Sequence, residues 1–245
     1  MTSDGSIVCT DIGKRFDGRR VLDGVSLSVS SSEIFSLVGP SGAGKTTLLR
    51  ILAALERPDA GNVEVLGMRA FGEPADDLRI RRSVGYVQQN AVMLSGTVED
   101  NISAPLKLRN VEPSRISTLV EEASSKLGVL DILKKKAKRI SGGEAQRVAF
   151  ARALVHGPRV LLLDEFTANL DPANVEILER TVREFASSGG TALMASHNIL
   201  QVKRLGTRVG ILMDGRIVES GEVAKVFAHP ESEQARRFLS GEMAW

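Results

Sequence analysis

Three glycines, a lysine and two threonines stand together in the stretch GPSGAGKTT, residues 39–47, directly after the apolar run 34–38. The stretch fits the spacing G-x-x-x-x-G-K-[ST]. Glycines let a backbone curl so that successive N–H groups point at an anion, and a following helix adds the positive end of its dipole. The lysine would reach the β- and γ-phosphates of a nucleotide, and the threonine after it would hold Mg²⁺. The predicted nucleotide-binding residues are Gly39, Pro40, Ser41, Gly42, Ala43, Gly44, Lys45, Thr46 and Thr47.

A second candidate is the segment VLLLDE, residues 160–165, in which an apolar run ends in two acids. Phosphoryl transfer needs the phosphate charge neutralised and a nucleophile held in line. Asp164 would act on the metal, through its water shell, and Glu165 would polarise the attacking water as general base. The alternative is a pair of acids at a strand end that simply faces solvent.

A third candidate is ISGGEAQR, residues 140–147, where a Ser-Gly-Gly turn opens a helix. Ser141 could donate its hydroxyl to an anion, and Gly142 and Gly143 could donate their N–H groups. The alternative is an ordinary helix cap, in which Ser141 and Glu144 form a capping box. The two roles are compatible. A second phosphate-binding turn needs an explanation, because one nucleotide does not obviously require both.

In type, order and spacing these motifs resemble those of the nucleotide-binding subunits of ATP-binding-cassette (ABC) transporters, from about residue 5 to the C-terminus. GPSGAGKTT is similar to the Walker A loop and VLLLDE to the Walker B strand. ISGGE stands where the family usually has Leu-Ser-Gly-Gly-Gln, and NLD, residues 169–171, resembles the D-loop. Two departures in the signature, Ile140 and Glu144, are mild. Phe166 replaces a proline that commonly follows the Walker B glutamate, which loosens one backbone constraint.

The resemblance implies roles for four more residues. His197 in ASHN would contact the γ-phosphate, although a strand-end histidine is otherwise a surface or core residue. Gln89 in GYVQQ, three residues after the tyrosine, would sense Mg²⁺ and the transporter interface; otherwise it is a polar loop residue. Phe16 would stack on adenine, or else belong to the core. Asp171 would act in the D-loop and could also cap the next helix. By the resemblance, the catalytic residues are Glu165, His197 and Gln89, and the metal ligands are Thr46, Gln89 and Asp164.

In this family two subunits pair head to tail, so that each ATP lies between the Walker loop of one and the Ser-Gly-Gly turn of the other. The resemblance therefore explains the second turn and implies a homodimer on ATP binding. It implies ATP and Mg²⁺ as cofactors, transmembrane permease subunits as partners, and a solute-binding protein if the transporter is an importer. The chain would then work at the cytoplasmic face of the membrane, held there by the permease.

The elements that must position these residues follow from the apolar pattern. Residues 6–38 are typical of antiparallel strands, with a hairpin signal at Asp17-Gly18 and a buried strand at 33–38 that leads into the phosphate loop. Strands are also expected at 61–67, 83–89, 159–165 and 191–196. A hairpin is expected at 208–220, turning at Asp214-Gly215. Helices are expected at 45–55, 142–156, 171–188 and 198–205, and two short ones after Gly221.

Residues 97–140 carry helix signals and no strand signals, with helices expected over 97–110 and 114–136. The fold class predicted is α/β, a P-loop NTPase core with a mixed, mainly parallel sheet, an N-terminal antiparallel β subdomain and an inserted helical subdomain. As one domain of 1–245, it would comprise a core of about 1–90 and 150–245 and a helical subdomain of about 91–149.

Composition sets outer limits. The chain has 245 residues, of which 42% are hydrophobic, enough for a sizeable core. With 32 basic and 30 acidic residues, the net charge of +2 gives no reason to expect nucleic acid as a partner. The single cysteine, Cys9, excludes an intrachain disulfide. The basic run KKKAKR, residues 134–139, is typical of a solvated face, although it could also approach the membrane or the permease.

The kind of cassette is less strongly indicated. SGTVEDNI and the ending HPESEQARRFLSGE resemble short importer subunits for phosphate, tungstate or polar amino acids. We therefore expect an ATP-hydrolysing subunit that energises import of a small solute such as an oxyanion or a polar amino acid. The alternatives are an export-type subunit and a soluble ABC ATPase such as an Fe–S assembly component.

Overall fold

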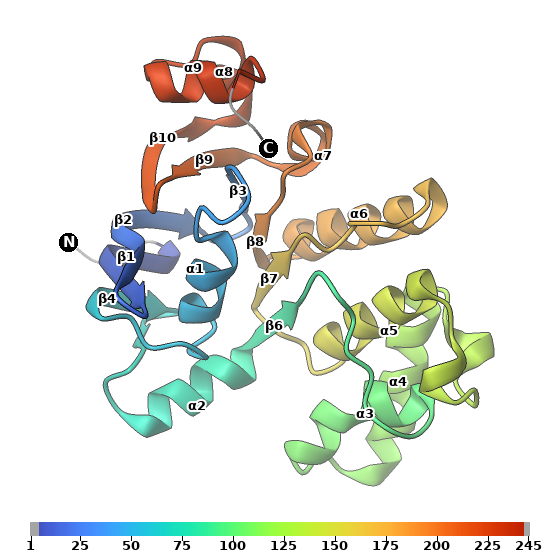
Figure 1. Cartoon of the computed structure of the whole chain (residues 1–245). Helices are drawn as coiled ribbons and strands as arrows, with labels where there is room; N and C mark the ends of the chain where they lie inside the picture. The colour runs from blue at the N-terminus through green and yellow to red at the C-terminus, as the bar shows by residue number, and fades with distance from the viewer. Residues whose placement is uncertain (1–4, 243–245) are drawn as a thin grey trace.

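The computed structural model describes residues 5–242, which form two β-sheets and a separate group of helices (Figure 1). The first sheet is antiparallel, in the order β2-β1-β4-β5. Its strands are β1 (Gly5–Phe16), β2 (Arg19–Ser30), β4 (Ala60–Val65) and β5 (Met68–Arg69). β1 and β2 meet at the predicted Asp17-Gly18 turn, where both residues have positive φ.

The second sheet has the order β10-β9-β3-β8-β7-β6, in which only β10 runs antiparallel to its neighbour. Its strands are β3 (Ile34–Val38), β6 (Val84–Val87), β7 (Val160–Asp164), β8 (Thr191–Ala195), β9 (Arg208–Met213) and β10 (Arg216–Glu222). Every residue of β3, β7 and β8 is buried, as expected for parallel strands covered on both faces. Ligands of such sheets bind beyond the carboxyl ends of the strands, where the loop after β3 and the acids after β7 lie.

Single helices connect β7 to β8 and β8 to β9, whereas a group of helices lies between β6 and β7 and two short helices follow β10. In the described chain the helices are α1 (Lys45–Leu52), α2 (Pro74–Ser83), α3 (Val98–Leu108), α4 (Pro113–Lys126), α5 (Gly142–Leu154), α6 (Pro172–Ser187), α7 (Ile199–Leu205), α8 (Val223–Ala228) and α9 (Glu233–Leu239). Figure 1 shows α3, α4 and α5 gathered at one end, away from the antiparallel sheet. Across residues 5–242 each helix is too short or too polar to traverse a bilayer.

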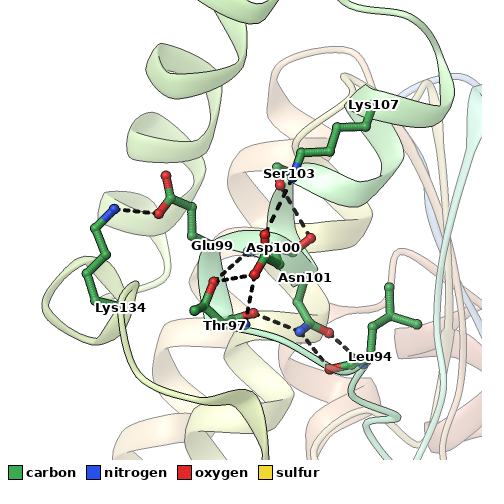
Figure 2. A network of polar contacts seen from close by, with 8 residues as sticks. All are labelled: Leu94, Thr97, Glu99, Asp100, Asn101, Ser103, Lys107 and Lys134. Atoms are coloured by element: carbon green, nitrogen blue, oxygen red, sulfur yellow. Dashed lines mark hydrogen bonds and ion pairs between the residues drawn. The ribbon is translucent and has the colours of Figure 1, made fainter.

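A polar network fixes the chain where it enters this helical group (Figure 2). Thr97 and Asp100 form a capping box: the Asp100 N–H donates to Thr97 Oγ1 at 3.1 Å, and the Thr97 N–H donates to Asp100 Oδ2 at 3.0 Å. Asn101, fully buried, donates to the carbonyls of Leu94 and Thr97 and accepts from the Leu94 N–H at 2.8 Å. Segment 94–97 is therefore held by side chains, although it belongs to no regular element.

The predicted fold class is confirmed, with three local corrections. Residues 34–38 lie in the parallel sheet between β8 and β9, so their inclusion in the antiparallel set was wrong. The helix expected over 114–136 ends at Lys126, because Gly128 takes a positive φ of 61° and only a short 3₁₀ turn follows at Leu130–Ile132. Helix α2 has no counterpart in the expectations, since Ile80 is its only buried residue and its apolar periodicity is weak.

Candidate functional site

The phosphate loop runs from the end of β3 to the start of α1, and two of its glycines are required by close packing. A Cβ on Gly39 would overlap the carbonyl oxygen of Leu212 in β9. Gly44 has φ 106°, and a Cβ there would lie 2.8 Å from the Val21 carbonyl oxygen in β2. The loop is thus wedged against the backbones of β2 and β9, which fixes its curvature.

Lys45 is 6% exposed and its ammonium lies within the loop. Its Nζ donates to the carbonyl oxygens of Gly39 at 2.6 Å and Pro40 at 3.0 Å. Burial lowers the pKa of Lys45, and the nearby carboxylates of Glu165 and Asp164 oppose that shift. An ammonium group has three donors, so one remains for an anion in the loop.

A cavity of about 940 Å³ opens over this loop. It is large enough for a nucleotide, since ligand pockets usually measure about 300–1,000 Å³. The predicted residues that line it are Phe16, Pro40, Ser41, Gly42, Ala43, Gly44, Lys45, Thr46, Thr47, Gln89 and Glu165. Phe16 is 43% exposed, with Lys14 Nζ 5.0 Å from its ring centroid, so it stands at the surface as a stacking platform would and not in the core.

The rest of the cavity wall was not predicted. It comes from the two hairpin turns, through Asp17, Arg19, Arg20, Val21, Asp214 and Gly215. Both turns were recognised as turns, but their approach depends on a contact between the sheets: the Asp23 N–H donates to the Gly215 carbonyl at 2.8 Å, and Arg216 pairs with Asp23. No local signal in the sequence indicates that contact.

Asp164 ends β7 and is 5% exposed. The pKa of its carboxyl is raised, first by burial and also by the Glu165 charge, while a hydrogen bond from Thr46 and the Lys45 ammonium oppose the shift. The hydroxyl of Tyr86, the tyrosine three residues before Gln89, had no predicted role and lies 3.5 Å from Asp164 Oδ2. Asp164 is therefore a buried carboxylate whose charge is incompletely compensated.

The oxygen donors of Thr46, Gln89 and Asp164 fit Mg²⁺, which is a hard cation. In residues 5–242 no group of three or more His, Cys, Asp or Glu could hold a metal ion. Magnesium at phosphate-transfer sites needs no such cluster, because it is bound by one or two carboxylates, substrate phosphates and water. The incompletely compensated charge of Asp164 is where a divalent cation would be most favourable.

Glu165 and His197 meet because β7 and β8 are neighbours in register, with Asp164 opposite Ala195. The Glu165 N–H donates to the Ala195 carbonyl at 3.0 Å, and its φ is 44°. Its Oε2 lies 3.2 Å from Nδ1 of His197. The Glu165 side chain is 17% exposed and that of His197 is 54% exposed, so the pair sits at the rim of the site.

Phe166 is held in place by packing. Its side chain is fully buried, and its ring centroid lies 5.5 Å from that of Phe150 in α5. A proline here would restrict φ, whereas Phe166 anchors the chain through its ring. The expected loss of one backbone constraint after Glu165 is therefore offset by a second constraint.

The Ser-Gly-Gly turn forms the predicted capping box at the start of α5. The Glu144 N–H donates to Ser141 Oγ at 3.2 Å, and the Ser141 N–H donates to Glu144 Oε2 at 2.7 Å, which lowers the pKa of Glu144. This box satisfies two of the four backbone donors that a helix start leaves unpaired. The two others belong to Gly142 and Gly143, whereas the Ser141 hydroxyl also hydrogen-bonds to the Glu144 carboxylate. These residues do not line the cavity over Lys45.

Asp171 caps α6, because its Oδ1 accepts a hydrogen bond from the Asn174 N–H at 3.0 Å. This is the capping role expected for Asp171 beside its role in the D-loop. The Asn174 side chain also hydrogen-bonds to Asp171 and to Arg147 of α5. It fills the space where a Cβ on Gly143 would stand, 2.6 Å from that point. Asn174, to which no motif in the sequence assigned a role, thus ties the Ser-Gly-Gly turn to the segment containing Asp171.

The basic run lies on the surface next to the same turn. Lys134 pairs with Glu99 at 2.6 Å and Lys135 with Glu144 at 3.5 Å, while Ala137 is buried. The charges of this run therefore point outward, as on a solvated face.

Comparison with known proteins places the site in context. A family model described as "ABC transporter" matches residues 22–168. The chain is 38% identical to a probable anion import ATP-binding protein of Haloferax volcanii, over 98% of this chain and 88% of that protein. It is 36% identical to the phosphate import ATP-binding protein PstB 2 of Natronomonas pharaonis, over 99% of this chain and 89% of that protein.

A solved structure shares the fold. The dimeric structure of a post-hydrolysis state of the ATP-binding cassette MJ0796, bound to ADP and Pi, superposes with a TM-score of 0.81. The two chains are 26% identical, and the match covers 89% of this chain and 98% of that one.

Proposed function

The chain belongs to the ABC transporter family, and we propose that it is the ATP-binding and ATP-hydrolysing subunit of an importer for a small anion. The observation that carries the proposal is the cavity that unites the phosphate loop with Phe16, Gln89 and Glu165. Both relatives described above are import ATP-binding proteins. They favour the importer over an export subunit or a soluble Fe–S assembly ATPase.

In the proposed reaction Glu165 accepts a proton from the attacking water, and His197 contacts the γ-phosphate. The 3.2 Å contact between Glu165 Oε2 and His197 Nδ1 supports a joint role, because the histidine limits the orientations of the carboxylate. Lys45 would turn its remaining donor toward the β- and γ-phosphates, and Phe16 would stack on the base.

We assign the metal to Thr46, Gln89 and Asp164, the oxygen donors described above. Bound Mg²⁺ would neutralise phosphate charge as it develops during transfer. The protein would supply the buried carboxylate of Asp164 at the end of β7 and the hydroxyl of Thr46 in the first turn of α1.

The Ser-Gly-Gly turn would serve the nucleotide of a second copy. Gly142 and Gly143 carry free backbone donors beside the Ser141 cap, and all three lie outside the cavity of their own chain, so an anion bound there would come from another subunit. The dimeric state of the similar cassette supports a homodimer, and the position of the turn outside its own cavity favours a head-to-tail arrangement formed on ATP binding. Asp171, tied to this turn through Asn174, would lie at the same interface.

The partners would be transmembrane permease subunits, which hold the chain at the cytoplasmic face of the membrane. An importer would also use a solute-binding protein outside. The relatives that import phosphate and an unspecified anion make an oxyanion the favoured solute, ahead of a polar amino acid. Stimulation of ATP turnover by phosphate, and not by amino acids, in a vesicle-reconstituted complex would support this choice; the reverse pattern would contradict it.

The direct test of the catalytic assignment is Glu165→Gln. Turnover of ATP should fall by about 10²-fold or more, the range for losing a general base, while ATP binding persists. Glu176→Gln, an exposed glutamate on α6, is the matched control and should leave turnover unchanged. Full activity of Glu165→Gln would refute the assignment.

A further inference from the structure

One buried side chain joins the two loops that carry Gln89 and Glu165. Gln146 lies on α5 and is 3% exposed. Its Nε2 donates to the carbonyl oxygen of Gln88 at 3.1 Å and to that of Phe166 at 3.0 Å. These carbonyls belong to the residue before Gln89 and the residue after Glu165. A single nitrogen therefore bridges the segments that leave β6 and β7.

The chemistry of the position suits an amide. A carboxamide nitrogen carries two N–H donors and no charge, so it can bind two carbonyls without the cost of burying an ion. Methionine has the same length but no donor. Glutamate has no donor when ionised and one when protonated. Of these three side chains, only the amide of Gln146 can therefore donate to both carbonyls, beyond the end of the ladder between β6 and β7.

Helix α5 holds the Gln89 segment at a second point. Arg152 donates from Nη2 to the Val92 carbonyl at 2.8 Å. The chain between Gln88 and Val92, which places Gln89 at the cavity, is therefore fastened to α5 at both ends. The same helix begins with the Ser-Gly-Gly turn, so a displacement of α5 would move the Gln89 segment and pull on the residue after Glu165.

We propose that Gln146 is a positioning residue for ATP hydrolysis, which holds Gln89 and Glu165 at their working separation through the two backbone carbonyls. The inference rests on the proposed roles of Gln89 and Glu165. It goes beyond them because Gln146 does not line the nucleotide cavity and, although it lies within the segment 140–147, it is not one of the residues proposed to contact ATP. Loss of a partner that orients a metal ligand typically costs about 10- to 100-fold in activity, and Gln89 is a proposed ligand of this kind.

The competing explanation is that Gln146 only satisfies two buried carbonyls, as most buried polar groups do. Removal of the amide would then lower the thermal midpoint of unfolding without changing the turnover of the folded protein. Thr181→Val supplies the matched control for this effect. Thr181 is 1% exposed, and its hydroxyl donates only within α6, to the Ile177 carbonyl at 2.8 Å.

The experiment measures kcat, the Kd for ATP and the unfolding midpoint of the purified chain and its variants. Gln146→Met should lower kcat by about 10-fold or more while the Kd for ATP changes by less than about 3-fold, because the phosphate loop and Phe16 are untouched. Thr181→Val should lower the midpoint and leave kcat unchanged. Unchanged kcat in folded Gln146→Met would overturn the proposal.

A second variant keeps the test decisive if Gln146→Met does not fold. Gln146→Glu places a buried carboxyl against two carbonyl oxygens, which favours its protonated form. Because only the protonated form can donate a hydrogen bond, the ratio of its kcat to that of the unmodified chain should increase when the pH is lowered from about 8 to about 6. An equal ratio at both pH values would count against positioning by a donated hydrogen bond. Glu165→Gln is measured in parallel, so that retained turnover there marks failure of the Glu165 assignment and not of Gln146.

Discussion

The two signature glycines offer a matched pair of perturbations with opposite expected effects on stability. Gly142 and Gly143 are the first two residues of α5. A Cβ on Gly142 meets nothing within 4 Å, whereas a Cβ on Gly143 would lie 2.6, 2.9 and 3.2 Å from three side-chain atoms of Asn174. Real Cβ contacts are rarely that short, so the Asn174 amide would have to move.

The magnitudes follow from this geometry. Replacing a helical glycine by alanine without strain stabilises a protein by about 0.5–1 kcal/mol, so Gly142→Ala should raise the free energy of unfolding by about 0.5 kcal/mol. Overpacking costs about 1–3 kcal/mol. Gly143→Ala should therefore lower the free energy of unfolding by about 0.5–2.5 kcal/mol in total. Urea unfolding without nucleotide, compared at equal slope, measures both values.

A double-mutant cycle identifies the cause. Asn174→Ala alone loses hydrogen bonds to Asp171 and Arg147, at a cost of about 1–2 kcal/mol. It also opens the space that the Cβ of Gly143→Ala requires. The double variant should be less destabilised than the sum of the singles by about 1 kcal/mol or more. Additivity within about 0.5 kcal/mol, or equal effects of Gly142→Ala and Gly143→Ala, would refute the assigned contact.

Three further outcomes test the site. Lys45→Ala should weaken ATP binding by at least about 10-fold in titration calorimetry, because a charge-assisted contact to the phosphates is lost; unchanged affinity would contradict that role. In a Glu165→Gln background, light scattering should show an ATP-dependent dimer that Ser141→Arg abolishes while each monomer still binds ATP; normal dimerisation would reduce the turn to a helix cap. Asp164→Asn should raise the nucleotide-free unfolding midpoint at neutral pH. Burial raises the Asp164 pKa, so the ionised carboxylate lowers the stability of the folded chain above that pKa, and this penalty fades as the pH falls through it. The difference in unfolding midpoint between Asp164→Asn and the unmodified chain should therefore shrink at acidic pH. An equal difference at neutral and acidic pH would argue against this cause.

The sequence indicated the candidate site residues more directly than the residues that support them. Lys45, Glu165 and Ser141 were singled out because phosphate binding demands those residue types at fixed spacing beside a strand or a helix start. The central strands were found because burial on both faces leaves a continuous apolar run, as in 160–163. Helix α2 escaped detection because it packs through one buried residue, and the periodicity that reveals a helix needs several.

The part of the cavity wall formed by the two hairpin turns could not be predicted for a different reason. Both hairpin turns were expected, yet their meeting depends on contacts between Asp23 and the turn residues about 190 positions later. Such a contact has no local pattern. It arises only when the two sheets pack, and a single sequence does not record the distance between turns on different sheets.

Several of the supports that the sequence concealed share one chemical type. Gln146, Asn101 and Asn174 are amides, and so is Gln201, which bonds to Ser196 and Thr167 beside the Glu165 and His197 segments. An amide can donate and accept at once and carries no charge to desolvate, so it can tie an irregular loop to a helix where an ion would be costly. A motif scan assigns these residues no role, because no reaction requires them, although Gln146 lies within the segment 140–147. They do leave one trace: Gln146 stands four positions before Phe150, on the buried face of α5, where the helical period predicts an apolar residue. A polar side chain at such a position must find partners in the interior, and here the partners are the carbonyls next to the proposed catalytic residues.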